Sequence, residues 1–303
     1  MKMTYSDIVL ELINNDDRYI IMTSENRAAF RSLPPLIKNN FVDTGITEQT
    51  MIGMAAGLAL RGRTPIVHAL ATFLTMRAFE FIRTDVGIAN LPVKIVGAVP
   101  GFLSDGNGPT HQAIEDVSIM RGIPNVNVFC PADEDDMITG LKTVFTCPSP
   151  FYIRYNTAKA VVEHGKFEIG KAEVFGNGTD VAILVYGFLF GESFKAKQIL
   201  ESKGVSVRLI NIRTPKPVDE ETILRSVDEC RLIVTIEDHF ITGGLYSILA
   251  EVLLRNRKTA AVLPFALMDK WFKPGMLNDV LNFEGFTAEQ IAVKIINQIS
   301  IDH

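Results

Sequence analysis

The chain has 303 residues, a formal net charge of -5 at pH 7 and a hydrophobic content of 47%. This length is enough for two domains, and the composition excludes an intrinsically disordered chain. Lys and Arg are scattered along an acidic chain, so there is no basic patch of the kind that binds nucleic acid.

The longest apolar stretches, residues 51–60 and 181–190, are shorter than the roughly 20 residues that a membrane helix needs. Acidic residues near the start precede any apolar region of signal-peptide length. We therefore expect a cytoplasmic protein with neither a nucleic-acid nor a membrane partner.

The three cysteines, Cys130, Cys147 and Cys230, are an odd set without Cys-x-x-Cys spacing. This pattern indicates neither a disulfide framework nor a zinc site. We expect buried thiols, which pack as small apolar groups, and we assign no metal ligand to this chain.

Hydrophobic periodicity predicts alternating strands and helices in the first half of the chain. Short β-branched runs predict strands at 19–22, 65–67, 93–96, 126–129 and 152–154. Apolar residues three or four positions apart predict helices at 47–61, 75–89, 111–121 and 134–145. Such alternation is typical of βαβ units with a mainly parallel sheet.

After residue 154 the chain becomes polar and rich in glycine before a second series of elements begins. Strands are predicted at 181–185, 205–210 and 232–236, and a final helix from Thr287, where Gln290 completes a capping box. We therefore predict two consecutive α/β domains with mainly parallel sheets, over residues 1–165 and 180–303. Residues 166–179 are expected to form the linker.

The sequence contains no Gly-x-Gly-x-x-Gly, P-loop or Gly-x-Ser-x-Gly, the strongest generic fingerprints of nucleotide sites and serine hydrolases. A first candidate for chemistry is Glu48, because the segment Asp43–Gln49 has the pattern of a strand end and a turn before an apolar helix. A carboxylate in a first helical turn is also explained by the helix dipole alone.

A second candidate is His111, near the end of the Gly- and Pro-rich segment Gly101–Gln112. We expect Thr110 to cap a helix that starts at His111. Near a cleft, this imidazole would act as an acid, a base or an oxyanion donor. A capped helix start with an incidental histidine is the alternative.

Two further candidates follow predicted strands. Phe73 is succeeded by Met76 and Phe79, a spacing typical of core packing. The same side chains would also form a wall for a planar ring, where offset stacking adds about 0.5–1.5 kcal/mol. Arg154 ends a strand, where open parallel sheets bind ligands. Its guanidinium suits an anion, and an ion pair with a neighbouring carboxylate is the alternative.

Several segments carry a family resemblance in this order: Gly45–Gln49, Thr72–Phe79, Gly108–Gln112, Ile123–Asn125 with Pro131–Asp133, and in the second domain Glu237–His239 with Gly243–Leu245. Together they resemble the pyrimidine-binding half and carboxy-terminal domain of transketolase, in particular the split form that is divided between two polypeptides. The resemblance covers nearly the whole chain. Gly-Pro-Thr-His-Gln after an Ile-x-Glu-Gln helix start is specific to the transketolase and deoxyxylulose-phosphate synthase branch.

The resemblance implies thiamine diphosphate chemistry. Glu48 would hydrogen-bond a ring nitrogen of the aminopyrimidine, and Phe73, Met76 and Phe79 would pack against that ring. His111 would reach the substrate oxygens and stabilise or move protons at the carbonyl.

The resemblance also implies substrate contacts from Asp105, Asn107, His111 and Arg154. Asn107 stands where many transketolases have an aspartate, and Val99 where a histidine is usual. We therefore expect a subunit that transfers a two-carbon ketol unit to an aldose phosphate from an unusual ketose donor. The donor, a sugar phosphate or a sulfo-sugar, would differ in its terminal group or branching.

In this family the diphosphate and its magnesium are held by a Gly-Asp-Gly motif, which is absent from this sequence. Magnesium needs oxygen ligands beside the phosphates. We therefore expect a separate N-terminal subunit to hold Mg2+, in an α2β2 assembly, and this chain to be inactive alone. The Gly- and Ala-rich helix after Glu48 is our predicted part of the interface.

Three alternatives stay open. The beta chain of a 2-oxoacid dehydrogenase shares the fold and the activating glutamate but lacks Gly-Pro-Thr-His-Gln. Deoxyxylulose-phosphate synthase shares the histidine motif but is usually one longer chain. A non-catalytic scaffold subunit would need none of this chemistry.

Overall fold

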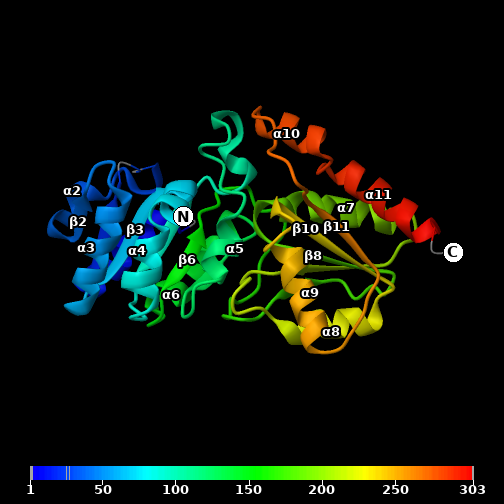
Figure 1. The fold of residues 1–303 in the computed structure, drawn as a ribbon, viewed down its shortest axis with the longest axis horizontal. Helices are drawn as coiled ribbons and strands as arrows, with labels where there is room; N and C mark the ends of the chain where they lie inside the picture. Colours follow the sequence, from blue (N-terminus) through cyan, green and yellow to red (C-terminus); the bar gives the residue numbers. More distant parts are fainter. Residues whose placement is uncertain (1–2, 25, 27, 302–303) are drawn as a thin grey trace.

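The computed structural model describes residues 3–24, 26 and 28–301, which form two α/β units side by side. In Figure 1 the first unit runs from blue to green and the second continues from green to red. The predicted fold class, two consecutive α/β domains with mainly parallel sheets, is confirmed.

The first sheet has the strand order β2-β1-β3-β4-β6-β5, and its neighbouring strands pair in parallel. Its strands are β1 (Tyr19–Thr23), β2 (Phe41–Asp43), β3 (Thr64–Leu70), β4 (Lys94–Ala98), β5 (Asn127–Phe129) and β6 (Phe151–Arg154). The strands predicted for this half are all present. The short strand β2 ends at Asp43, immediately before the turn that leads to Glu48.

The first unit also contains α1 (Tyr5–Asn15), α2 (Pro34–Ile37), α3 (Glu48–Leu60), α4 (Phe79–Phe81), α5 (Asp116–Arg121) and α6 (Glu134–Thr146). The helices predicted at 47–61 and 134–145 correspond to α3 and α6 and are confirmed. Asp133 caps α6 by accepting a hydrogen bond from the backbone N–H of Asp136 (3.0 Å).

The helix predicted at 75–89 is interrupted in the structure. Helix α4 lies between π-helical turns at Phe73–Arg77 and Ile82–Gly87. Turns of this kind occur frequently at functional sites. The first of them carries Phe73 and Met76, two of the predicted cofactor contacts.

The helix predicted at 111–121 begins later, as α5 at Asp116. Gly101 and Ala113 form an isolated antiparallel bridge, in which the Gly101 N–H donates to the Ala113 carbonyl (2.9 Å). A residue in such a bridge is extended and does not start a helix. The prediction that Thr110 caps a helix starting at His111 is therefore wrong, and His111 lies in a turn.

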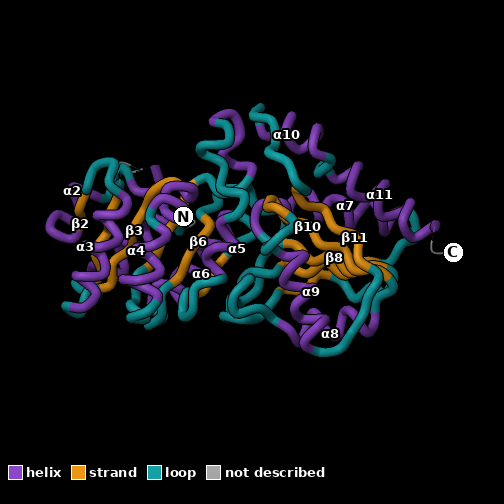
Figure 2. The backbone as a smooth tube through the Cα atoms, viewed as in Figure 1, coloured by secondary structure: helices purple, strands orange, loops and turns teal. Residues whose placement is uncertain are grey.

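The second sheet has the order β11-β10-β8-β9-β7 and is parallel except for β7, which pairs antiparallel with β9. Its strands are β7 (Glu173–Phe175), β8 (Val181–Val185), β9 (Val207–Asn211), β10 (Leu232–Phe240) and β11 (Val262–Leu267). Its helices are α7 (Phe190–Ser202), α8 (Glu220–Glu229), α9 (Leu245–Arg255), α10 (Leu277–Glu284) and α11 (Ala288–Ile301). Figure 2 shows α7 and α11 on one face of this sheet and α8 and α9 on the other.

The segment 166–179, expected to be a linker, contains strand β7. The three-residue strand was missed because it is short, polar in part and flanked by glycines. The capping box at the last helix is confirmed, since the Gln290 N–H donates to Thr287 Oγ1 (3.4 Å) and the Thr287 N–H to Gln290 Oε1 (3.3 Å).

Buried apolar residues continue from one unit into the other. One cluster joins Met51 and Ile95 of the first unit to Leu184, Ile210 and Leu249 of the second. The two units therefore share one hydrophobic core. This shared core positions the loops between them.

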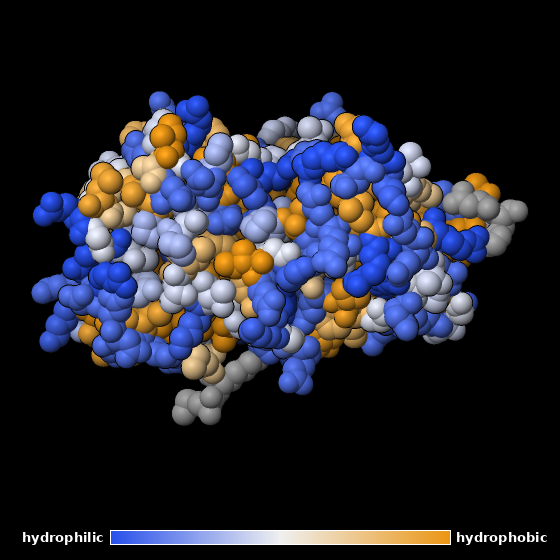
Figure 3. All heavy atoms as spheres, turned by 90° about the horizontal axis from the view of Figure 1, so that it is seen from below, coloured by the Kyte–Doolittle hydropathy of each residue, from blue (hydrophilic) through white to orange (hydrophobic). Residues whose placement is uncertain are grey.

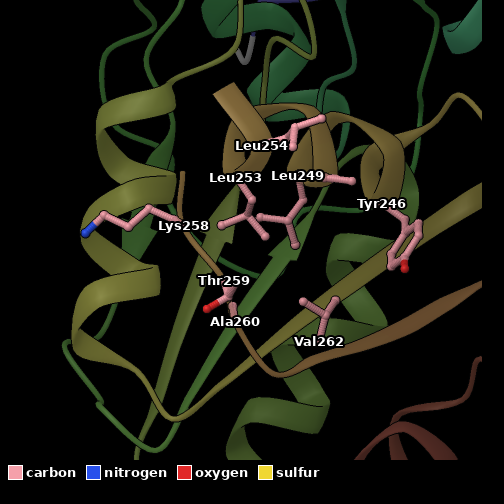
Figure 4. Close-up of a pocket in the computed structure, with 9 residues that line it drawn as sticks. Tyr246, Leu249, Leu253, Leu254, Lys258, Thr259, Ala260 and Val262 are labelled. Carbon is pink, nitrogen blue, oxygen red and sulfur yellow. The ribbon is translucent and has the colours of Figure 1, made fainter. Parts of the chain in front are cut away.

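The expectation of buried thiols is confirmed for Cys130, whereas Cys147 and Cys230 are only half-buried. All three cysteines are free. None of the helices in residues 3–24, 26 and 28–301 has the length and apolar character to cross a membrane. The face seen in Figure 3 is mainly hydrophilic, with separate apolar patches over both units.

Candidate active site

Glu48 is the first residue of α3, and only 2% of it is exposed. Its Oε2 accepts a hydrogen bond from Arg77 Nη1 at 2.9 Å. A helix dipole accounts for a carboxylate at this position, but it does not account for burial against a specific arginine. Glu48 is therefore part of a cluster of side chains from separate elements.

Arg77 links Glu48 to the aromatic side chain that the sequence singled out. Its guanidinium carbon lies 4.1 Å from the centre of the Phe73 ring, within the range of a cation–π contact. The Arg77 side chain is 41% exposed, so it covers Phe73 from the solvent side. Arg77 belongs to the motif Thr72–Phe79, for which the sequence predicted no role of the arginine. Its position four residues after Phe73 on a helical segment was the signal that was available.

His111 contacts the same cluster from the Gly- and Pro-rich loop that follows β4. Its ring centre lies 5.2 Å from that of Phe73, in an edge-on arrangement with an angle of 63°. Its Nδ1 lies 2.9 Å from Thr110 Oγ1, which fixes the orientation of the ring. The structure thus brings Glu48, Arg77, Phe73 and His111 into one continuous set of contacts, which we call the acid–aromatic cluster.

Met76 and Phe79 lie near the cluster with different surroundings. Met76 is half-buried, and its sulfur accepts a hydrogen bond from Thr72 Oγ1 at 3.5 Å. Phe79 packs against the hydrophobic core. Met76 therefore shares the π-helical turn of Phe73, whereas Phe79 is held mainly by core packing.

Asp105 and Asn107 lie on the loop that leads to His111. Asp105 accepts a hydrogen bond from the Gly106 N–H at 2.6 Å, and Asn107 donates from Nδ2 to the Ser104 carbonyl at 3.1 Å. Asn107 is exposed, so its amide remains open to further contacts. Both residues are placed on the same loop as His111, as the motif implied.

Arg154 adopts the alternative arrangement, an ion pair. It is 2% exposed and contacts two buried carboxylates, with Nη2 at 2.8 Å from Asp116 Oδ1 and Nη1 at 2.5 Å from Asp238 Oδ1. This set of Asp116, Arg154 and Asp238, which we call the loop joint, connects the two domains. The guanidinium is engaged by these two carboxylates, and the contact of Arg154 with a substrate stays a prediction.

Two buried side chains near His111 lack hydrogen-bond partners within the described part of the chain. They are Ser104, at its hydroxyl, and Gln112, at both polar atoms of its amide. Buried polar groups are nearly always hydrogen-bonded. Hydrogen bonds within the described part of the chain therefore satisfy only some of the buried polar groups of this loop.

A second ionic cluster also joins the two domains. It consists of Asp133, Asp136, His164, Glu173 and Arg213, and we call it the linker joint. Burial alone would lower the pKa of His164, but its hydrogen bonds to Asp133 (2.8 Å) and Glu173 (2.7 Å) raise it to about 10.

Three members of the linker joint, Asp136, His164 and Glu173, place possible ligand atoms within 4.8 Å of one another. A protonated imidazole is not a metal ligand. Arg213 already supplies a second positive charge, with Nε at 2.7 Å from Asp136. The set therefore acts as an ion network between domains, and we do not assign a metal to it.

The fold and the cluster define a two-domain α/β protein of the transketolase type. Residues 7–160 match the family model described as transketolase, pyrimidine binding domain, and residues 170–291 match transketolase, C-terminal domain. This chain belongs to the transketolase family, and the resemblance drawn from its motifs is confirmed.

Two curated relatives span most of the chain. A 6-deoxy-6-sulfo-D-fructose transketolase subunit, SqwH, of Clostridium sp. (strain MSTE9) is 36% identical over 261 residues, covering 84% of this chain and 81% of that protein. A putative transketolase C-terminal section of Methanocaldococcus jannaschii is 31% identical over 306 residues, covering 99% and 96%. A solved split gene transketolase, described as an inactive beta4 tetramer, superposes with a TM-score of 0.88 at 29% identity and covers 99% of this chain and 98% of its own.

A further relative is a longer protein. The 1-deoxy-D-xylulose-5-phosphate synthase of Dictyoglomus thermophilum is 37% identical over 262 residues, which cover 85% of this chain and 42% of that protein. This chain therefore corresponds to less than half of that synthase.

Family membership implies dependence on thiamine diphosphate, and the acid–aromatic cluster fits one end of this cofactor. Glu48 has a buried carboxylate of the kind that a ring nitrogen needs, and Phe73 has an aromatic face covered by the partly exposed guanidinium of Arg77. The cluster contains no set of oxygen ligands for a diphosphate and its metal ion among the described residues.

Proposed function

We propose that this chain is the C-terminal subunit of a heteromeric transketolase. It would transfer a two-carbon ketol unit from a ketose donor to an aldose phosphate acceptor. The observation that carries this proposal is the acid–aromatic cluster, in which a buried glutamate, an aromatic face and a histidine meet at one edge of the first sheet.

When bound, thiamine diphosphate supplies the carbon nucleophile and the electron sink of ketol transfer. Glu48 would hold the aminopyrimidine through a hydrogen bond, and its burial excludes the water that competes for that bond. Phe73 and Met76 would pack against the flat ring. His111, oriented by Thr110, would donate to or accept protons from the oxygens of the sugar.

Arg77 prepares the site in the absence of a ligand. A buried carboxylate without a partner is costly, and the 2.9 Å contact with Arg77 offsets the charge of Glu48. The guanidinium is 41% exposed, and we propose that it turns toward solvent when a ligand binds. The ring of Phe73 and the carboxylate of Glu48 would then both face an incoming pyrimidine.

The missing half of the site would come from a separate N-terminal subunit that holds the diphosphate and Mg2+. This proposal is supported by the absence of Gly-Asp-Gly and by the split organisation named for similar proteins. Helix α3 supplies a suitable surface, because Met54 and Leu60 are 42% and 71% exposed and Ile46 before it is 66% exposed. We propose an α2β2 assembly.

For the donor, we propose a ketose with an altered terminal group, such as a sulfonate, with a sugar phosphate as the competing choice. The named substrate of the SqwH relative supports a sulfo-sugar. Asn107 replaces a usual carboxylate with a neutral amide, and Arg154 is paired with the carboxylates of the loop joint. Recognition of the sugar would therefore rest in part on other groups than those common in the family.

The test is ketol transfer by the complex of this chain with its partner chain, using 6-deoxy-6-sulfo-D-fructose and xylulose 5-phosphate as donors. We expect Glu48→Gln to lower turnover by about 100-fold or more, because the variant cannot share a proton with the ring nitrogen. Glu80→Gln, at an exposed glutamate of α4, is the matched control and should leave turnover unchanged.

Each other outcome of this assay contradicts part of the proposal. A clear preference for xylulose 5-phosphate would overturn the donor assignment. Formation of 1-deoxyxylulose 5-phosphate from pyruvate would favour the synthase function named for the Dictyoglomus relative. Full turnover by Glu48→Gln, or no turnover by any combination, would favour a scaffold subunit.

A further inference from the structure

The loop that carries His111 has a strained backbone. Within residues 99–112, which we call the His111 loop, Val99 has φ +46° and Asp105 has φ +24°. A β-branched residue in the left-handed region is a rare outlier. Such strain costs about 1–3 kcal/mol per residue and persists only where the surroundings hold the chain in place. Contacts from outside the loop must therefore fix it.

Those contacts come from the second domain. Phe102, near the start of the loop, is fully buried, and its ring lies 4.9 Å from that of Phe272 and 5.2 Å from that of Phe286. Figure 1 shows this loop, in cyan-green, beside α10 of the second domain. The loop therefore belongs to the first domain by sequence but is packed by the second.

At the base of the loop, Asp238 at the end of β10 lies directly against Gly101. A Cβ atom on Gly101, which has φ +58°, would lie 1.6 Å from Asp238 Oδ2. No other residue fits here, because the carboxylate occupies the space of a side chain. Gly101 is also the residue that closes the loop by its bridge to Ala113.

Asp238 is held in this position by the loop joint. Its Oδ1 lies 2.5 Å from Arg154 Nη1, and Arg154 Nη2 also donates to the Ala113 carbonyl at 3.4 Å. Both ends of the loop closure, Gly101 and Ala113, therefore contact the same ion pair. Burial raises the pKa of Asp238 to about 6, although Arg154 opposes this shift.

We propose that Asp238 is a positioning residue, through which the second domain holds the His111 loop in the conformation that presents His111 to the substrate. Asp238 has no contact with His111 itself and acts through Gly101. This inference rests on the proposed function for its kinetic consequences, but the claim about the loop stands on the geometry alone.

The test uses Asp238→Asn, which removes the charge and keeps the shape. The matched control is Asp136→Asn, which makes the same change in the linker joint, where the carboxylate faces Arg213 and the Ala132 N–H rather than Gly101. Hydrogen exchange of the backbone amides of residues 101–112 is measured on the intact chain. kcat and KM are measured on the complex with the partner chain.

We expect Asp238→Asn to speed exchange in the loop by about tenfold. We also expect it to lower kcat by about 100-fold, because a shift of about 1 Å in a catalytic group has this effect. Asp136→Asn should leave both loop exchange and kcat within about twofold of the wild type. Equal effects of the two variants, or a protected loop in Asp238→Asn, would overturn the proposal.

A second variant covers the case in which Asp238→Asn does not fold. Phe272→Leu loosens the aromatic contact to Phe102 without touching the loop joint, and the proposal requires faster loop exchange there too. If the complex transfers no ketol group but loop exchange changes as expected, the proposed function is wrong. The claim that the second domain holds the His111 loop in place is then still supported.

Discussion

Both ionic joints between the domains pair buried carboxylates with an arginine, but they differ in their number of cations and in what they contact. The linker joint combines three carboxylates with two cations, His164 and Arg213, and it fastens α6 to β7 and β9. The loop joint has two carboxylates and one cation, Arg154. It also touches the loop that carries the candidate catalytic histidine, and one oxygen of Asp238 has no hydrogen-bond partner among the described residues.

This difference suggests that one joint serves mainly stability and the other also serves the site. In the linker joint, a second cation still faces the carboxylates when one cation is lost. In the loop joint, both Asp116 and Asp238 depend on Arg154 alone. The comparison can be tested by removing cations, changing the loop and changing the pH.

The largest effect is expected from Arg154→Met. Removing the cation leaves two buried carboxylates unpaired, and breaking a buried pair in this way costs about 3–5 kcal/mol. Arg213→Met should cost less, because His164 remains in the linker joint. The free energy of unfolding from urea titration measures both.

The exposed pair Arg255–Glu220 provides the control for this series. Arg255→Ala should change stability by less than about 1 kcal/mol, as exposed ion pairs do. If Arg154→Met destabilises the chain no more than Arg255→Ala, the two carboxylates of the loop joint do not depend on Arg154 as we infer.

A smaller effect is expected from Gly101→Ala. The left-handed backbone costs an L-residue about 1–2 kcal/mol, and the new methyl group would collide with Asp238. We expect lower stability together with increased hydrogen exchange in the His111 loop. Gly57→Ala, in α3 with open space around it and an ordinary φ, is the control and should not destabilise the chain. An unchanged stability in Gly101→Ala would show that Asp238 does not occupy this space.

The smallest effect is expected from pH at the linker joint. The pKa of His164 is about 10 in the folded chain and near 6.5 as the ordinary value. Its contribution to stability is therefore complete below about pH 6.5 and is lost as the pH rises through about 10. The difference in Tm between the wild type and His164→Gln should shrink over this range. A constant difference would mean that His164 is neutral in the folded chain.

Much of the fold followed from local pattern. The strands of the first domain, α3, α6 and the capping box at Thr287 have strong periodicity or clear end signals. The start of α5 was missed because the bridge between Gly101 and Ala113 is a non-local contact that overrides a local helix signal. Strand β7 was missed because three residues carry too little periodicity.

The residues of the site were predictable where several motif residues lie close together in the sequence. Glu48, Phe73 and His111 were identified from the sequence, and the structure places them together. The contact of Arg77 with Phe73 had a local signal, but the pairings of Arg77 with Glu48 and of Arg154 with Asp238 depend on partners far away in the chain. The choice between an anion site and an ion pair at Arg154 required the position of Asp238, 84 residues further on.

The central claim is that this chain holds only the pyrimidine end of a thiamine diphosphate site. The most direct measurement is calorimetric titration of thiamine diphosphate with Mg2+ into this chain, into its partner chain and into their mixture. We predict tight binding in the mixture and none to this chain alone, since the Gly-Asp-Gly motif expected to hold the diphosphate is absent from its sequence. Tight, Mg2+-dependent binding by this chain alone would contradict the claim.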